Sequence, residues 1–153
     1  MILSRENIAK VVSDFKKQNK TIVFTNGCFD IIHSGHIYYL SEAKKLGDYL
    51  IVGLNTDSSV KRLKGNSRPI NSELDRAIVL DCLKPVDFVV LFDEDTPLSL
   101  IQEISPDILV KGGDYNPDEI VGSDFMKQKN GRVVIIPFLV GKSTTSIIKK
   151  IKN

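Results

Sequence analysis

Short, continuous runs of β-branched and aliphatic residues alternate with amphipathic segments along the chain, and this alternation constrains the fold more than any other feature. Continuous apolar runs are typical of strands buried on both faces of a parallel sheet. We expect strands at residues 21–25, 49–54, 88–92, 108–110 and 133–137. The sequence therefore predicts an α/β fold with a doubly wound, parallel, five-stranded, Rossmann-like sheet.

The segments between the apolar runs have the periodicity and the end signals of helices. Asn71 stands before one apolar-periodic segment and Gly47 follows another, as capping residues do. We expect helices at residues 4–17, 34–46, 71–83, 97–104, 117–129 and 144–151.

Composition narrows the class of protein. The 153 residues contain no linker, repeat or low-complexity stretch, so we expect one domain over residues 1–153. The numbers of basic and acidic residues, 21 and 19, are too similar to indicate a surface that binds nucleic acid or a membrane.

The sequence favours a cytoplasmic protein with reduced cysteines. No apolar run approaches the length of a membrane span, and residues 1–20 lack the features of a secretory signal. Cys28 and Cys82 are too few for a structural zinc site.

Both histidines lie in one motif directly after the first predicted strand, where a doubly wound fold binds its ligands. The motif reads Asn26-Gly27-Cys28-Phe29-Asp30-Ile31-Ile32-His33-Ser34-Gly35-His36 and continues into a predicted helix. Glycine permits close approach of the backbone, and a helix N-terminus attracts phosphate. Two imidazoles there can donate hydrogen bonds to the oxygens of a bound triphosphate that gain negative charge when one of its phosphate groups is transferred. We predict His33 and His36 as catalytic residues; ordinary surface or capping histidines are the alternative.

A second phosphate-binding candidate opens the last predicted helix. Gly141-Lys142-Ser143 resembles the end of a kinase P-loop, but Ile136 stands where that motif requires a glycine. The hydroxyls of Ser143, Thr144 and Thr145 remain candidates for holding phosphate oxygens, with simple capping by Ser143 or Thr144 as the alternative.

Basic residues follow the second predicted strand in a segment, 61–68, that we expect to be a flexible loop. Nucleotidyl transfer needs cations on the phosphates, and Lys61 and Lys64 are the candidates. Arg76 lies among apolar residues of the next helix, where a buried arginine needs an anionic partner. That partner is either substrate phosphate or an internal carboxylate such as Asp75 or Asp87.

A glycine-rich turn, Lys111-Gly112-Gly113-Asp114-Tyr115, follows the fourth predicted strand, which lies beside the first in a doubly wound sheet. A base can dock against the paired glycines, Asp114 can accept from a ribose or base group, and Lys111 can reach a phosphate. The alternative is a plain turn in which Asp114 caps the next helix.

Several of these motifs, in this order, resemble one protein family over nearly the whole chain. The histidine motif and Ser143-Thr144-Thr145-Ser146-Ile147-Ile148 are similar to the cytidylyltransferase-like nucleotidyltransferases. One branch, the D-glycero-β-D-manno-heptose 1-phosphate adenylyltransferases, resembles the chain further at Lys61-Arg62-Leu63-Lys64-Gly65, Arg68-Pro69, Glu94-Asp95-Thr96-Pro97 and residues 106–115.

The resemblance implies that ATP and heptose 1-phosphate give ADP-heptose and pyrophosphate for the lipopolysaccharide core, with Mg²⁺ and in a homodimer. Mg²⁺ is expected mainly on triphosphate oxygens and water, with at most one or two protein ligands, of which Asp30 is the first candidate. A sugar kinase, fused to this domain in many bacteria, is expected to be a separate protein here. The implied roles place both histidines on the phosphates, Lys64 or a neighbour on the α-phosphate, and nucleotide contacts at Asn26, Gly27, Cys28, Phe29, Asp30, Lys61, Lys111, Gly112, Asp114 and residues 143–145.

Two other functions stay open. Glycerol-3-phosphate cytidylyltransferases share the fold and the histidines, but they typically have Arg-Thr-Glu-Gly-Ile where this chain has residues 138–142, and Gly-Asp-Asp-Trp where it has residues 112–115. A nucleotide-sensing module without catalysis is the other alternative. The intact histidine pair and the basic segment count against it, because a sensor need not keep transfer groups.

Overall fold

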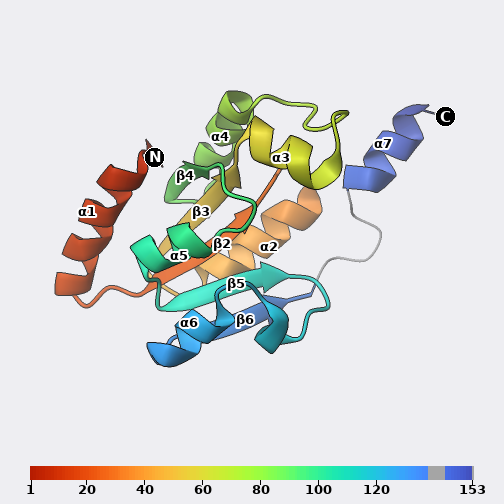
Figure 1. The fold of residues 1–153 in the computed structure, drawn as a ribbon. Coiled ribbons are helices and arrows are strands. Elements are labelled where there is room, and N and C mark those ends of the chain that lie inside the picture. Colours follow the sequence, from red (N-terminus) through yellow and green to blue (C-terminus); the bar gives the residue numbers. More distant parts are fainter. Residues whose placement is uncertain (138–143, 153) are drawn as a thin grey trace.

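A single sheet of parallel strands runs through the molecule (Figure 1). The computed structural model describes residues 1–137 and 144–152. Its strands lie in the order β1-β4-β3-β2-β5-β6, and every neighbouring pair is parallel. They are β1 (Ile2–Leu3), β2 (Ile22–Gly27), β3 (Tyr49–Asn55), β4 (Phe88–Phe92), β5 (Ile108–Gly112) and β6 (Arg132–Ile136).

The predicted doubly wound parallel sheet is confirmed, with six strands rather than five. The additional strand, β1, contains two residues and pairs with β4 at one edge of the sheet. So short a strand has no recognisable apolar run, and pairing with β4 alone defines it. The five predicted strands are all present, and β2 and β5 continue two residues further, through Gly27 and Gly112.

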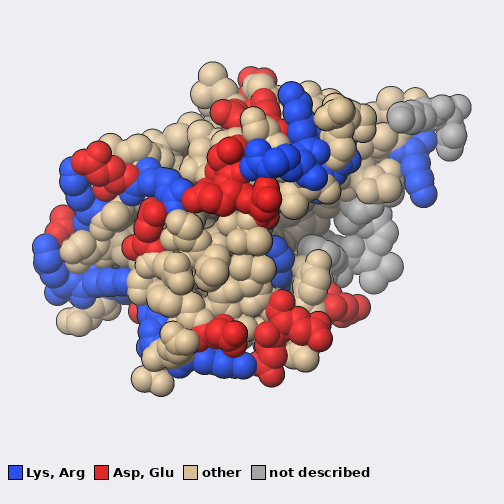
Figure 2. Space-filling model, viewed as in Figure 1, with Lys and Arg blue, Asp and Glu red and all other residues tan. Residues whose placement is uncertain are grey.

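Helices cover both faces of the sheet. The helices are α1 (Arg5–Lys17), α2 (Ser34–Lys44), α3 (Asp57–Lys64), α4 (Glu73–Asp81), α5 (Leu98–Ile104), α6 (Ser123–Gln128) and α7 (Thr144–Lys152), with a 3₁₀ turn, η1 (Pro117–Glu119). Within the described ranges, no helix is long and apolar enough to cross a membrane. Figure 2 shows basic and acidic side chains interspersed over the face in view.

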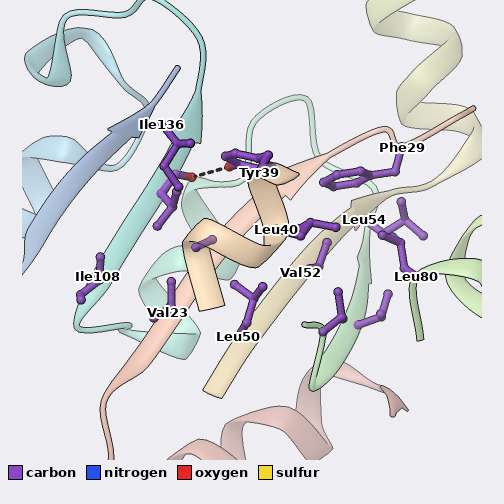
Figure 3. Close-up of a cluster of buried hydrophobic side chains, with 14 of the residues drawn as sticks. Val23, Phe29, Tyr39, Leu40, Leu50, Val52, Leu54, Leu80, Ile108 and Ile136 are labelled. Atoms are coloured by element: carbon purple, nitrogen blue, oxygen red, sulfur yellow. Dashed lines mark hydrogen bonds between the residues drawn. The ribbon is translucent and has the colours of Figure 1, made fainter. Parts of the chain in front are cut away.

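Two apolar clusters, one on each face, hold the layers together. On β2, Val23 packs in the cluster with Tyr39 and Leu40 of α2, which Figure 3 shows together with Leu80 of α4. The next residue, Phe24, points to the other face and packs with helices α1, α5 and α6. Because successive side chains of a strand point to opposite faces of the sheet, Val23 and Phe24 are both completely buried. Gly53 of β3 makes room for Phe24, since a Cβ there would lie 2.8 Å from its ring.

Two predictions about helices need correction. Half of the segment 61–68, expected to be a flexible basic loop, is helical: residues 61–64 form the end of α3, and residues 65–68 follow it outside any helix. Thr56 caps α3 by accepting from the N–H of Ser59 at 3.2 Å. Only Ser59 and Val60 are buried in that helix, so its apolar stripe is too short to recognise. The helix expected at 117–129 is divided into η1 and α6, because Gly122 takes a left-handed φ of 93°. Helices α2 and α4 end earlier than predicted.

The strand order places a crevice beside β2. On one side of β2 lie β3 and then β4, the next two strands along the chain. On its other side lies β5, which follows β4 in the sequence. The order therefore reverses between β2 and β5, and ligands of such sheets bind at the carboxyl ends of the strands at this point.

Candidate active site

A cavity of about 230 Å³ opens at the carboxyl ends of β2 and β5. It brings together the turn after β2, the first turn of α2, the end of α3, the α3–α4 loop, the end of β5 and the start of α7. Most of the predicted site residues lie here. The lining residues are Asn26, Gly27, Cys28, Phe29, Asp30, His36, Tyr39, Lys64, Arg68, Lys111, Gly112, Tyr115 and Thr144.

The histidine pair lies at the N-terminus of α2. His33 is the N-cap of that helix, and its Nδ1 accepts from the N–H of Gly35 at 3.1 Å. A neutral ring held in this way carries its proton on Nε2 and is a donor there. The ring of His36 lies 4.0 Å from that of His33 between centroids and 5.3 Å from Phe29. The fold thus holds both imidazoles side by side at a helix end that favours anions.

The charge state of His36 follows from its surroundings. Burial is the largest cause of a lowered pKa at His36, and electrostatic interactions with His33 and Lys64 add to it, so that the pKa falls to about 4. His36 is therefore neutral near pH 7. Its Nδ1 is buried without a hydrogen-bond partner in the part of the chain that the structure describes. A neutral imidazole has one N–H, so it can donate a hydrogen bond to a phosphate oxygen without carrying a positive charge.

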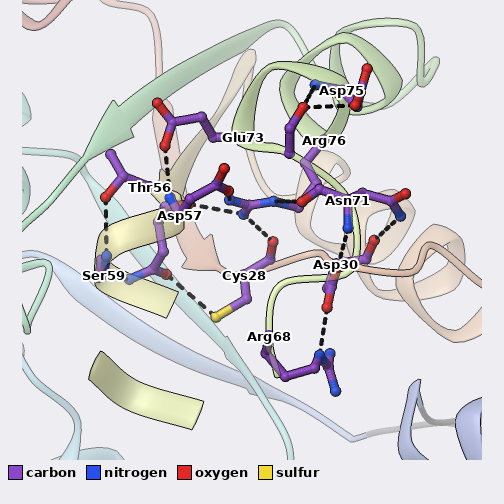
Figure 4. A network of polar contacts seen from close by, with 12 residues as sticks. Cys28, Asp30, Thr56, Asp57, Ser59, Arg68, Asn71, Glu73, Asp75 and Arg76 are labelled. Atoms are coloured by element: carbon purple, nitrogen blue, oxygen red, sulfur yellow. Dashed lines mark hydrogen bonds and ion pairs between the residues drawn. The ribbon is translucent and has the colours of Figure 1, made fainter. Parts of the chain in front are cut away.

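The turn after β2 is anchored through Asp30, which is 1% exposed (Figure 4). Its carboxylate accepts from Arg68 Nε at 2.6 Å and from the backbone N–H groups of Ile70 and Asn71 at 2.8 and 3.0 Å. Burial alone would raise the pKa of Asp30, but these N–H donors and the charge of Arg68 together lower it. Asp30 is therefore a charged anchor for the α3–α4 loop.

That geometry corrects the expected metal role of Asp30. Both of its oxygens are engaged by protein donors, so a metal ion would have to displace them. Residues 1–137 and 144–152 contain no group of three His, Cys, Asp or Glu side chains able to hold a metal. The described residues do not fit a metal site built by the protein itself.

Arg76 is the second correction, because its guanidinium is engaged entirely with the protein (Figure 4). It is 1% exposed and pairs with Asp57 at 2.7 Å. Its other donors go to the backbone oxygens of Cys28, Asn55 and Asn71 at 2.7, 2.9 and 3.1 Å. Arg76 therefore does not hold substrate phosphate. An internal carboxylate partner was the alternative, and that partner is Asp57 rather than Asp75 or Asp87.

Other groups shape the cavity from β5, α2 and α7. Burial lowers the pKa of Lys111, partly offset by Cys28 beside it. The Tyr39 hydroxyl bonds Thr25 and donates to the Val110 oxygen at 3.2 Å, which fixes α2 against the sheet. Thr144 donates to the oxygen of Ile31 at 3.3 Å, so α7 begins beside the histidine motif.

Some predicted residues lie elsewhere, and the structure adds others. Lys61, Asp114 and Thr145 are exposed and do not line the cavity. Ser143 lies outside the described residues. The cavity also contains side chains that the sequence analysis did not assign to the site: Arg68, Tyr39 and Tyr115. For Arg68 a signal existed, since it ends the basic segment; for Tyr39, inside a helix, there was none.

A crevice at the switch point of a doubly wound sheet, with paired imidazoles at a helix N-terminus and lysines around it, defines a site for the phosphates of a nucleotide. The profile of the cytidylyltransferase-like family matches residues 24–150. The chain belongs to that family, and it is a nucleotidyltransferase.

Curated relatives are longer than this chain. It is 57% identical to the bifunctional protein HldE of Wolinella succinogenes over 152 residues, which are 99% of this chain and 31% of that protein. It is 59% identical to the bifunctional protein HldE of Campylobacter concisus, over 98% of this chain and 30% of that protein. The chain thus spans about three tenths of the length of these relatives.

Solved structures agree on the fold. The lipopolysaccharide core biosynthesis protein from Thermoplasma volcanium GSS1 is 33% identical, with a TM-score of 0.62 over 78% of this chain and 97% of that one. Pantoate-beta-alanine ligase from Francisella tularensis, in complex with an ATP analogue and beta-alanine, has a TM-score of 0.66 over 99% of this chain and 77% of its own. At 15% identity, the ligase shows likeness of fold alone.

Proposed function

We propose that this chain is an adenylyltransferase that transfers AMP from ATP to D-glycero-β-D-manno-heptose 1-phosphate. The products are ADP-heptose, used for the lipopolysaccharide core, and pyrophosphate. One observation carries the proposal: the paired imidazoles of His33 and His36 at the start of α2, with Lys64 close enough to lower the pKa of His36. Similarity to the HldE proteins supports the choice of acceptor.

The transfer step is a displacement at the α-phosphorus. An oxygen of the acceptor phosphate forms a bond to that phosphorus, and the bond from it to the oxygen bridging to the β-phosphorus breaks. Pyrophosphate leaves with the electron pair, so the step needs no oxidant and no net proton transfer. His33 and His36 donate hydrogen bonds to phosphate oxygens as their charge grows, while Lys64 offsets that charge.

A divalent cation accompanies the nucleotide in this proposal, and we propose Mg²⁺. It would be held mainly by triphosphate oxygens and water, because Mg²⁺ keeps much of its hydration and the described cavity residues have no spare carboxylate cluster. Bound there, it would neutralise part of the triphosphate charge.

Gly27, in the turn after β2, lets the nucleotide come close to the backbone. A Cβ at this position would lie 3.0 Å from the Phe29 ring.

The base is expected at the end of β5. Lys111 and Gly112 lie there beside Asn26 and Cys28, and Tyr115 adds an aromatic face. We propose ATP over CTP on the resemblance of residues 111–115 to the adenylyl branch. We also propose that the reaction takes place in the cytoplasm, where ATP is supplied.

A homodimer completes the proposed assembly. The outward side of α4 and the loop before it expose the apolar residues Ile70, Leu74, Ile78 and Val79. Leu74 and Ile78 are one turn apart, 62% and 48% exposed, and so form one apolar face. A second copy of the chain would remove this face from water.

A pyrophosphate-release assay over nucleoside triphosphates and acceptor phosphates tests the function. ATP with heptose 1-phosphate should be the fastest pair, and CTP should lose about tenfold to a few hundredfold in kcat/KM. Faster turnover of CTP with glycerol 3-phosphate would assign the chain to the cytidylyl branch. Nucleotide binding without pyrophosphate release from any acceptor would favour a sensing module instead.

A further inference from the structure

Arg68 is held in the cavity by one edge of its guanidinium. Its Nε donates to Asp30 at 2.6 Å, and the side chain is 15% exposed. Among the residues that the structure describes, no group accepts from its two terminal nitrogens. Figure 4 shows the Arg68 guanidinium meeting Asp30 through this one hydrogen bond. An arginine fixed on one side, with a two-donor fork open to a cavity, matches the geometry of a phosphate.

The anchor of Arg68 is itself rigid. Asp30 accepts from two backbone N–H groups of the α3–α4 loop, and its own backbone oxygen accepts from Asn71 Nδ2 at 2.6 Å. The side chain of Asp30 is buried, which restricts it to this conformation. A cation placed in this way loses little conformational freedom when it binds an anion.

The Lys and Arg side chains that line the cavity, Lys64, Arg68 and Lys111, come from three places: the end of α3, the α3–α4 loop and β5. Lys64 lies close enough to His36 to lower its pKa, so it belongs with the histidine pair at the helix end proposed for the triphosphate. Arg68 lies on the Asp30 side of the cavity, where its Nε donates to the Asp30 carboxylate. A displacement at phosphorus brings a second anion opposite the leaving group, and a separate cation must offset the repulsion. Arg76 does not supply that cation, because its buried guanidinium pairs with Asp57 and donates to three backbone oxygens inside the protein.

We propose that Arg68 binds the phosphate group of the acceptor and that Asp30 is its positioning residue. This inference rests on the proposed function, since it assigns one substrate of the same site. Arg68 then sets the approach of the attacking oxygen, while the histidine pair and Lys64 serve the nucleotide.

Steady-state kinetics of Arg68→Gln and Arg68→Lys test the assignment. In Arg68→Gln, the KM for heptose 1-phosphate should rise about ten- to a hundredfold, while the KM for ATP changes about twofold or less. Arg68→Lys should restore part of the loss, because it keeps the charge but not the fork. Asp30→Asn should show a smaller rise for the same substrate. A rise in the KM for ATP alone would overturn the assignment and place Arg68 on the triphosphate.

Arg62→Gln is the matched control. Arg62 lies on α3, exposed and paired with Asp93 and Asp95, and does not line the cavity. Its loss should leave both KM values within about twofold, because exposed ion pairs contribute little. Thermal unfolding of each variant shows whether the fold is kept.

A binding measurement separates this inference from the proposed function. With a non-hydrolysable ATP analogue bound, titration with inorganic phosphate should show binding to wild type and at least about tenfold weaker binding to Arg68→Gln. Equal phosphate affinity in both proteins would overturn the inference. If wild type released no pyrophosphate with any sugar 1-phosphate, the proposed function would fail, and this titration would still decide whether Arg68 forms the anion site.

Discussion

At the scale of single residues, His36 shows how position sets chemistry. Its ring lies near the rings of both Phe29 and His33, and burial is the largest cause of its low pKa. A cationic histidine would attract the triphosphate in every state of the reaction, whereas a neutral donor acts mainly where oxygen charge grows. The effect of His36 is therefore expected on turnover more than on nucleotide affinity.

The first prediction concerns catalysis. His36→Ala should lower kcat by about 10²–10³ with a much smaller change in the Kd for ATP, because the lost hydrogen bond matters most in the transition state. Pyrophosphate release and calorimetric ATP binding measure the two quantities. A variant with nearly wild-type turnover would remove the histidine pair from the mechanism.

The second prediction concerns pH and stability. The pKa of His36 is about 4 in the folded protein and 6.5 in the unfolded chain, so between these values the unfolded chain binds more protons. The contribution of His36 to the free energy of unfolding is therefore complete above pH 6.5 and should be lost as the pH drops toward 4. Urea unfolding of wild type and His36→Gln at several pH values measures this. The free energy of unfolding should fall more steeply in wild type, and parallel curves would contradict the low pKa.

At the scale of elements, the network around Arg76 determines how the cavity is assembled. From α4 this one side chain reaches the turn after β2, the end of β3 and the first residue of α3. It thereby sets where α3 begins, and α3 ends at Lys64 in the cavity. Asp30 ties the following loop to the same turn.

The third prediction tests this network. Arg76→Met should lower the free energy of unfolding by about 3–5 kcal/mol, because it leaves buried carbonyl oxygens unpaired and Asp57 without its partner. Chemical unfolding followed by fluorescence or circular dichroism measures the loss. Arg62→Gln, which removes an exposed arginine from the neighbouring helix, should leave the free energy of unfolding nearly unchanged, because exposed ion pairs contribute little. Similar losses in the two variants would refute a structural role specific to Arg76.

At the scale of the whole molecule, the prediction concerns assembly. Leu74→Glu together with Ile78→Glu should convert the proposed homodimer to a monomer, because charges would be placed on its apolar face. Light scattering on purified protein measures the mass. Leu98→Glu on α5, 37% exposed, is the control and should leave the mass unchanged. A monomeric wild type would contradict the proposed dimer directly.

Much of the molecule follows from local pattern. Continuous apolar runs between helix signals defined the parallel sheet, because a strand buried on both faces needs no polar alternation. The position of His33 and His36 after the first predicted strand predicted that both lie at the crevice, since the chain leaves parallel strands at the edge where ligands bind, and the structure places them at the start of α2 there. The same reasoning brought Lys111 and Gly112 to that edge, at the end of β5.

Tertiary contacts decided the rest. The burial of Arg76 depends on Asp57, a residue nineteen positions away on another helix, and no local pattern identifies that partner. Strand β1 exists only through its pairing with β4, and the short α3 has too few apolar residues to be seen without its neighbours. Sequence by itself determined the fold class and the edge of the sheet at which the candidate site lies, because these depend on periodicity and order along the chain. Only the tertiary structure decided which arginine is used internally and which one faces the cavity, because hydrogen-bond partners distant in sequence make that choice.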